Sequence, residues 1–268
     1  MDEQTLRAGV LPFQIVEAWG VGCGYERSCK LSARRILANR YLLGVDTAKV
    51  DRNRFLEAAR RLGMPQALYD RFHDGLPEAN LVFLGFEDSE EDGCIYKIYL
   101  EYWQRLKRRL ESGAGDGEPQ LLHEGFKWYV DAPARQVVTR YECLPRLDAA
   151  QIVQHIEAAY QDAPSTATLE AVRRILALAA SSAAGKRLLF VQVSEPGNPR
   201  RSFDLNVYPA GLRVRDAITP IRRAAASLQV PVDKLERLMS MIPDKHLGHI
   251  SGGLSRGGDE YLTVYYER

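Results

Sequence analysis

Lysine, tyrosine and acidic side chains alternate with apolar ones along several β-rich segments of the chain. Along 95–103 the polar positions are Lys97, Tyr99 and Glu101, and later segments repeat the pattern with Lys127 and Tyr129, with Asp204, Asn206 and Tyr208, and with Thr263 and Tyr265. Successive residues of a strand point to opposite faces, so each set shares one face. A lysine neutralises an anion, and a tyrosine ring attracts a cation by about 0.5–2 kcal/mol. These faces therefore have the chemistry to hold a charged ligand.

The elements that carry these residues form a repeated pattern of strand, short connection, strand and helix. Turn-forming residues join the two strands of each pair, which is typical of β-hairpins. The predicted strand pairs are 26–31 with 40–45, 80–87 with 94–103, 124–130 with 136–142, 187–194 with 201–208, and 247–254 with 260–266. Helices are predicted between the pairs, for example at 52–62 and after the capping box of Asp148 and Gln151.

Two arrangements fit ten antiparallel strands with one apolar and one polar face. An open sheet would leave its polar face in solvent, whereas a closed barrel would gather that face into a wet interior. The polar faces carry many tyrosines and few flexible surface residues, which favours the barrel. We therefore predict an α+β fold: a closed ten-stranded antiparallel β-barrel of five αββα repeats surrounded by helices, as a single domain over residues 1–268.

Composition and charge exclude several classes of protein. The 36 basic and 35 acidic residues nearly cancel, so no overall field attracts nucleic acid or an anionic membrane. The four cysteines form no CxxC pair and stand at no metal-ligand spacing from a histidine, which argues against a zinc site. The N-terminal segment is acidic and polar, unlike a signal peptide. We predict a cytoplasmic monomer that binds neither nucleic acid nor membrane.

Two segments carry a resemblance to a known family. The stretch 25–43, YERSCKLSARRILANRYLL, resembles the N-terminal motif of the cyanobactin prenyltransferases of the TruF/PatF type. The segment IYKIYLEYW at 95–103 resembles the second-hairpin strand of that family, and ten strands from five αββα repeats are the architecture of its ABBA barrel. The resemblance implies transfer of an isoprenyl group from a diphosphate to a side chain of a ribosomally made, usually cyclic, peptide. It also implies dependence on Mg²⁺.

The resemblance assigns roles to individual residues. Glu26 matches the motif glutamate that serves as catalytic base, Arg40 the arginine that meets the diphosphate, and Lys97 the lysine of the second hairpin. Tyr99 stands where the family often has histidine. To these we add Lys127 as a third diphosphate ligand. Tyrosines would shield the allylic cation and donate to the diphosphate, namely Tyr99, Tyr129, Tyr208 and Tyr265.

Each of these residues also has a plainer interpretation. Glu26 at a strand start could be solvated, and Arg40 follows a helix-like stretch and could lie on the surface. Lys97 and Lys127 could be exposed strand charges, and inward tyrosines could fill a core. Their joint placement on one face of several hairpins favours the functional interpretation.

Other motifs receive structural interpretations. GGDEY at 257–261 resembles the diguanylate cyclase signature, but only seven residues follow it, so we interpret it as a turn before the last strand. The acidic run 87–92 lacks the spacing of a magnesium-binding motif and is interpreted as a solvated hairpin loop. HISGG at 249–253 is interpreted as a bulged strand, in which His249 is a candidate to face the cavity.

Three functions remain open at this stage. The first is a peptide prenyltransferase that uses dimethylallyl or geranyl diphosphate together with Mg²⁺. The second is a small-molecule aromatic prenyltransferase, and the third is a barrel that binds a ligand without catalysis. Glu101 and Asp204 are candidate acceptor ligands, because two carboxylates match a guanidinium and would suit an arginine acceptor beside tyrosine and tryptophan. Alternatively, Glu101 lies in solvent at a strand end and Asp204 caps a turn.

Overall fold

The computed structural model describes residues 2–113, 117–183 and 185–267. The chain forms two compact units. Unit 1 comprises Met1–Glu26, Asn39–Asp116 and Gln120–Glu142, and unit 2 comprises Arg27–Ala38, Gly117–Pro119 and Cys143–Arg268. The predicted single domain over 1–268 stays a prediction.

Unit 1 is built on a sheet with the strand order β3-β4-β5-β6-β7, and β3 to β6 pair antiparallel. The strands are β3 (Arg40–Asp46), β4 (Leu81–Asp88), β5 (Cys94–Glu101), β6 (Gln120–Tyr129) and β7 (Gln136–Leu144). Its helices are α1 (Glu3–Glu17), α2 (Arg52–Arg61), α3 (Gln66–Gly75) and α4 (Trp103–Glu111), with 3₁₀ turns η1 (Thr47–Lys49), η2 (Leu76–Glu78) and η3 (Glu90–Asp92).

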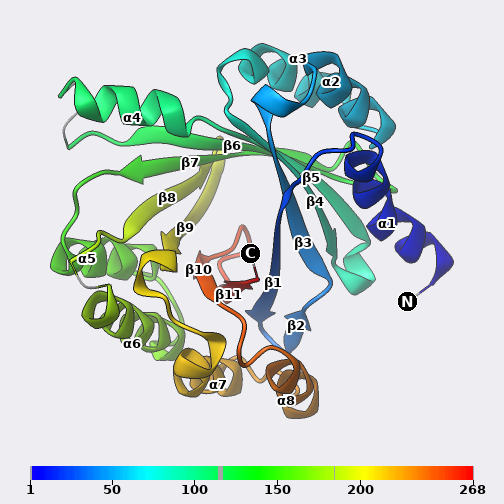
Figure 1. The fold of residues 1–268 in the computed structure, drawn as a ribbon. Coiled ribbons are helices and arrows are strands. Elements are labelled where there is room, and N and C mark those ends of the chain that lie inside the picture. Colours follow the sequence, from blue (N-terminus) through cyan, green and yellow to red (C-terminus); the bar gives the residue numbers. More distant parts are fainter. Residues whose placement is uncertain (1, 114–116, 184, 268) are drawn as a thin grey trace. The chain divides into compact units, whose positions relative to one another are not determined.

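One face of this sheet packs against helices (Figure 1). Helix α1 lies on β3 and β4, and the core joins Phe55 of α2 and Phe72 of α3 to the alternate strand residues Leu84, Ile98 and Phe126. All five side chains are buried. The predicted apolar face of the second and third hairpins is thereby confirmed, and the opposite face of the same strands carries the polar side chains.

Unit 2 contains the strand order β8-β9-β10-β11-β1-β2. The strands are β1 (Gly24–Ser32), which begins in unit 1, β2 (Arg35–Leu37), β8 (Leu189–Glu195), β9 (Asn198–Asn206), β10 (Leu247–Leu254) and β11 (Glu260–Tyr266). The helices are α5 (Ala149–Ala159), α6 (Ala167–Ser182), α7 (Ile218–Ser227) and α8 (Val232–Met241), with 3₁₀ turns η4 (Tyr208–Ala210) and η5 (Val214–Ala217).

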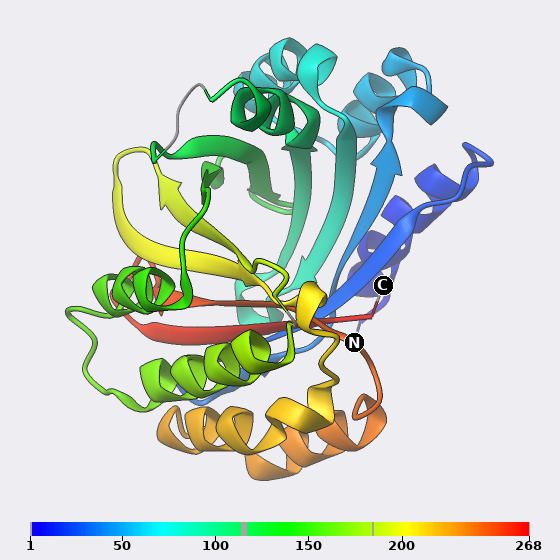
Figure 2. The same cartoon turned by 60° about the vertical axis from the view of Figure 1, so that its left-hand side comes forward.

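Helices again cover one face of the strands. In Figure 2, α6 to α8 lie on one side of β10 and β11, which are drawn in red. Ile175 of α6 belongs to the same buried cluster as Phe203, Leu205, Ile250 and Val264 of the strands. The predicted capping box is confirmed, because the Asp148 side chain accepts from Gln151 N and the Gln151 side chain accepts from Asp148 N. The polar face of unit 2 lies on the other side of the strands.

Each predicted strand corresponds to an observed one, and the differences lie at the ends. The strand predicted at 94–103 stops at Glu101, because Trp103 opens α4. Tyr208 lies in η4 rather than in β9, where Pro209 cannot continue a ladder. Helices α1, α3 and α4 and the short strand β2 were not predicted. No helix in the described part of the chain is both long and apolar enough to cross a membrane.

Candidate functional site

In unit 1, a buried carboxylate holds two cations on the polar face of the sheet. Glu87 accepts a hydrogen bond from Arg40 Nε at 2.9 Å and forms an ion pair with Lys97 through the same oxygen, Oε2. All three residues are buried, with 6–8% of each exposed. The strand register explains the contact, because Arg40 lies directly opposite Glu87 and Lys97 lies diagonally across from it. We call this group the Glu87 clamp.

Lys127 lies beside the clamp in the register and among tyrosine rings. Its position in β6 is opposite Lys97, and its Nζ is 3.4 Å from the hydroxyl of Tyr141. The same nitrogen is 5.8 Å from the ring centres of both Tyr99 and Tyr141, which contact each other edge to face. The structure thus brings the predicted residues Lys97, Tyr99 and Lys127 to one face, and adds Tyr141.

At the other end of these strands an acidic side chain meets a histidine. Glu101 Oε2 lies 3.1 Å from His123 Nε2, and Glu101 Oε1 accepts from Asn80 Nδ2 at 2.9 Å. Phe83 and Tyr141 contact the His123 ring. Glu101 is therefore bound by polar neighbours rather than solvated at a strand end.

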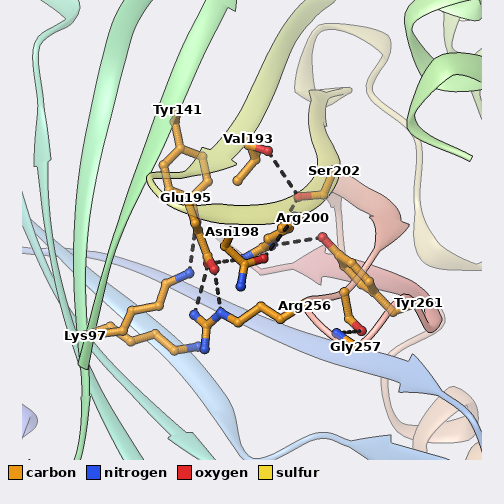
Figure 3. Close-up of polar contacts among 12 residues, drawn as sticks. Lys97, Tyr141, Val193, Glu195, Asn198, Arg200, Ser202, Arg256, Gly257 and Tyr261 are labelled. Atoms are coloured by element: carbon orange, nitrogen blue, oxygen red, sulfur yellow. Dashed lines mark hydrogen bonds and ion pairs between the residues drawn. The ribbon is translucent and has the colours of Figure 1, made fainter. Parts of the chain in front are cut away.

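Unit 2 contains a second carboxylate that holds two cations, shown in Figure 3. Glu195, whose side chain is fully buried, accepts from Arg200 Nη1 at 2.6 Å and from Arg256 Nη2 at 3.0 Å, while Arg256 Nε bonds its other oxygen. Glu195 and Arg200 come from the two strands of the tight β8–β9 hairpin, in which Glu195 lies opposite Asn198, and Arg256 comes from the turn between β10 and β11. We call this group the Glu195 clamp.

A buried tyrosine adjoins the Glu195 clamp. The hydroxyl of Tyr261 accepts from Arg200 Nη2 at 3.0 Å, and Lys30 Nζ lies 4.8 Å from the ring centre. Burial alone raises the pKa of Tyr261. The positive charges of Arg200 and Lys30 and hydrogen bonds with Ser202 and Arg200 outweigh it, so that the pKa lies below its ordinary value. Surroundings that favour a phenolate would also favour another anion at this place.

A histidine and an aspartate pair lies farther along the polar face of unit 2. His249 Nδ1 is 2.6 Å from Asp204 Oδ1. The rings of Tyr208 and Tyr265 contact the imidazole nearly edge to face, with centres 5.5 and 5.9 Å from it. The candidates Asp204, Tyr208 and Tyr265 are thereby brought together around His249. Asp204 binds the imidazole and does not cap a turn.

The remaining predicted residues are Glu26 and Tyr129. Glu26 is a half-buried residue of β1 and the last residue of the first segment of unit 1. Tyr129 lies at the end of β6, where Arg135 of the hairpin turn covers its ring at 3.7 Å. The catalytic role of Glu26 and the shielding role of Tyr129 stay predictions.

Sequence reasoning missed the two central carboxylates. Glu87 ends the predicted strand 80–87, but it also opens the acidic run 87–92 that is interpreted as a solvated loop. Strand alternation from Phe83 and Gly85 carried a signal, because it places Glu87 on the polar face. Glu195, Arg200 and Arg256 adjoin hairpin turns rich in proline and glycine, which hid their strand register. Tyr261 lies in the predicted strand 260–266 but is not among the predicted site residues.

The two clamps have a common chemistry. Each places two cations around a buried carboxylate, where a lone charge would be costly, although Arg256 of the Glu195 clamp is 45% exposed. Each clamp, with two cations and one carboxylate, carries a net charge of +1. It is therefore suited to bind a further polyanion, because arginine supplies forked donors and lysine a point charge. Tyrosine rings on the same faces suit a positive charge that develops nearby.

No family model and no curated protein match the sequence. Among solved structures, 6-dimethylallyltryptophan synthase from Micromonospora olivasterospora, in complex with DMASPP and Trp, superposes with a TM-score of 0.55 and 15% identity over 91% of this chain and 81% of that chain. The 5-dimethylallyltryptophan synthase from Streptomyces coelicolor gives 0.56 and 17% over 91% and 80%.

A third similar structure is the binary complex of the prenyltransferase PriB with product diphosphate. It gives a TM-score of 0.57 and 18% identity over 91% of this chain and 79% of that chain. At these identities the likeness shows the fold. The predicted fold class is thereby confirmed: the chain has the ABBA prenyltransferase fold, a ten-stranded antiparallel β-barrel surrounded by helices.

Proposed function

We propose that this protein transfers a dimethylallyl group from its diphosphate to an aromatic acceptor. The observation that carries the proposal is that buried carboxylates hold paired cations on strand faces that also carry tyrosines. The fold adds support, since it is the fold of enzymes crystallised with product diphosphate and with DMASPP.

The chemistry of prenyl transfer matches these groups. The carbon–oxygen bond of the donor breaks and its electrons go to the diphosphate, which gathers negative charge. Cations held in place before the reaction stabilise that charge without reorganisation. Arg40 and Lys97, with Lys127 beside them, are the proposed diphosphate ligands in unit 1. Tyr99 offers a ring face to the allylic cation.

The proposed catalytic base is Glu26, by the resemblance of the segment 25–43 to the cyanobactin prenyltransferases. A carboxylate serves as a base when its surroundings raise its pKa toward the working pH. The half-buried position of Glu26 in β1 is compatible with that role.

Mg²⁺ is proposed to arrive with the diphosphate. Among the described residues, no three His, Cys, Asp or Glu side chains stand close enough to hold a metal ion. Mg²⁺ keeps several waters and binds substrate phosphate oxygens, so it needs no protein cage. The described residues therefore fit a Mg²⁺ ion that arrives bound to the donor diphosphate. We expect turnover to fall in chelator and no tight Mg²⁺ binding without donor; full turnover in chelator contradicts the proposal.

The acceptor is proposed to be a tyrosine, tryptophan or arginine side chain of a peptide, by the same resemblance. A small aromatic molecule is the second candidate, because a structure of the same fold was crystallised with free tryptophan. Glu101 and Asp204 bind His123 and His249 in the structure, so an arginine acceptor would have to compete with imidazoles for these carboxylates.

Mass spectrometry tests these proposals. The protein is incubated with dimethylallyl or geranyl diphosphate and with linear and cyclic peptides that carry one Tyr, Trp or Arg, beside free tryptophan and tyrosine. We expect the mass of one dimethylallyl group on an aromatic acceptor. Modification of free amino acids alone would reject the peptide acceptor, and no transfer with any acceptor would reject the proposed function.

A further inference from the structure

We propose that His249, oriented by Asp204, accepts the proton that the acceptor loses on prenylation. The proposal rests on the proposed prenyl transfer and assigns this proton to His249 in place of Glu26. It is carried by the geometry of the polar face of unit 2.

The first observation is the orientation of the imidazole. His249 and Asp204 come from the paired strands β10 and β9, and the register places Asp204 opposite Ser251, two residues from His249. Nδ1 and Oδ1 are 2.6 Å apart, and the side chains are only 23% and 15% exposed. A carboxylate accepts from Nδ1–H and so fixes the neutral tautomer with its lone pair on Nε2. It also stabilises the imidazolium that forms when Nε2 takes a proton.

The second observation is that the surroundings fix the ring in place. The titratable groups brought against it include Asp204 from β9, Tyr208 from η4 and Tyr265 from β11. Gly248 makes room for this packing, because a Cβ there would lie 2.4 Å from Cζ of Tyr208. A change in the β10–β11 register between Leu247 and His249 sets the direction of the side chain.

The third observation is the spacing between His249 and the Glu195 clamp. Tyr265 lies opposite His249 and Tyr261 lies opposite Gly253, so the two levels are four residues apart on both strands. Four residues of a strand span about 13 Å. The level between them holds the small pair Ser251 and Thr263. An anion bound at Arg200 and Tyr261, as a second anion site besides the diphosphate ligands proposed in unit 1, would lie about 13 Å from His249 along the strands.

The reaction balances with His249 as proton acceptor. The donor carbon–oxygen bond breaks with both electrons on the diphosphate, and an electron pair of the acceptor forms the new bond to the allylic carbon. The acceptor's hydrogen leaves as a proton to Nε2, while the electrons of that bond return to the acceptor. The imidazolium releases the proton to solvent, so the products are prenylated acceptor, diphosphate and one proton.

Unit 1 supplies a matched control. His123 is also paired with a carboxylate and flanked by rings, but its contact to Glu101 is 3.1 Å and uses Nε2, the nitrogen that His249 would use for the proton. His123→Ala removes an imidazole of the same kind without touching the proposed base.

The experiment measures the pH dependence of kcat for wild type, His249→Ala, Asp204→Asn, His123→Ala and Glu26→Gln, with an acceptor from the mass-spectrometric panel. A general base contributes typically about 10²–10⁴-fold. We expect His249→Ala to lower kcat within that range and to lose the acidic limb of the profile, and added imidazole to restore part of the rate. Asp204→Asn should move the acidic limb to lower pH, because the imidazolium loses its counter-charge. His123→Ala should keep the shape of the wild-type profile.

Donor binding to each variant, measured by calorimetry with dimethylallyl thiolodiphosphate, separates the two levels of the proposal. Wild type that neither binds donor nor forms product rejects the proposed function itself. If wild type turns over while His249→Ala keeps the acidic limb, the role of His249 is rejected, and loss of that limb in Glu26→Gln alone assigns the proton to Glu26. If His249→Ala does not bind donor, the pH profile of Asp204→Asn decides the outcome. An acidic limb at the same pH as in wild type rejects the proposal.

Discussion

At the residue scale, the structure turns single predicted charges into groups with a defined chemistry. Arg40 and Lys97 were predicted to meet one anion, and in the structure both bind Glu87. A buried ion group of this kind is a weak source of stability, because desolvation offsets much of the attraction. Its value for a catalyst lies in holding cations where an anionic substrate binds.

Arg40→Ala should weaken donor binding by about 1.5–3 kcal/mol, the range for a hydrogen bond to a charged group. The reason is the loss of one guanidinium that the Glu87 clamp holds in place. Calorimetric titration with dimethylallyl thiolodiphosphate measures it, and Arg54→Ala on the exposed side of α2 is the control. A donor-bound structure with Arg40 and Lys97 both away from the diphosphate contradicts the assignment.

Tyr261 should ionise below the ordinary tyrosine pKa of about 10. Burial opposes ionisation, but Arg200, Ser202 and Lys30 favour the phenolate more strongly. Because the folded-state pKa is the lower one, ionisation adds stability as the pH rises toward the unfolded-state value, and Arg200→Gln should diminish that gain. Alkaline titration of tyrosinate absorbance measures the shift. The lowest-pH component should vanish in Tyr261→Phe and move to higher pH in Arg200→Gln; a component that stays in Tyr261→Phe belongs to another residue.

At the element scale, the sequence predicted what local patterning encodes. The hairpin strands and the α5 capping box follow from alternation, turn residues and the spacing of Asp148 and Gln151. Helix α1 was missed although Ala8, Ile15 and Val16 have helical spacing, because Pro12 stands inside it. The clamps could not be derived from pattern alone, since register between strands decides which carboxylate meets which cation.

Gly253→Ala should lower the free energy of unfolding by at least about 2 kcal/mol. Gly253 has a φ of +117°, and a Cβ would lie 2.3 Å from the backbone oxygen of Arg201. Backbone strain costs about 1–3 kcal/mol, and overpacking typically adds about 1–3 kcal/mol. Chemical denaturation measures the change, with Gly22→Ala as the control, where no atom lies within 4 Å of the added Cβ. Equal stability of both variants would contradict the prediction and show that the backbone of β10 shifts to accommodate the added Cβ.

At the scale of the whole molecule, the net charge does not reveal how cations are grouped around the buried carboxylates. The chain carries a formal charge of only +1, which predicts no general attraction for anions. Within each unit, however, cations gather on the polar strand face around a buried carboxylate, and exposed ion pairs such as Arg222 with Glu236 lie elsewhere. A composition cannot report this distribution, because it depends on which residues alternate toward which face.

Global stability should distinguish the buried clamp from a surface pair. Glu195→Gln leaves the mostly buried Arg200 without its counter-charge, and breaking a buried ion pair from one side costs about 3–5 kcal/mol. Arg256 also loses its partner, but it is 45% exposed, so solvent screens its charge. Glu236→Gln, the control, removes an exposed partner of Arg222 and should change stability little, since solvent screens that pair. Because an anion that binds only the folded state stabilises it by about 2.7 kcal/mol at a hundred times its dissociation constant, inorganic diphosphate should recover part of the loss in Glu195→Gln. Denaturation with and without diphosphate measures both effects. Two results together would contradict the description of this clamp as an anion-binding group. Glu195→Gln would be as stable as wild type, and diphosphate would stabilise it no more than it stabilises wild type.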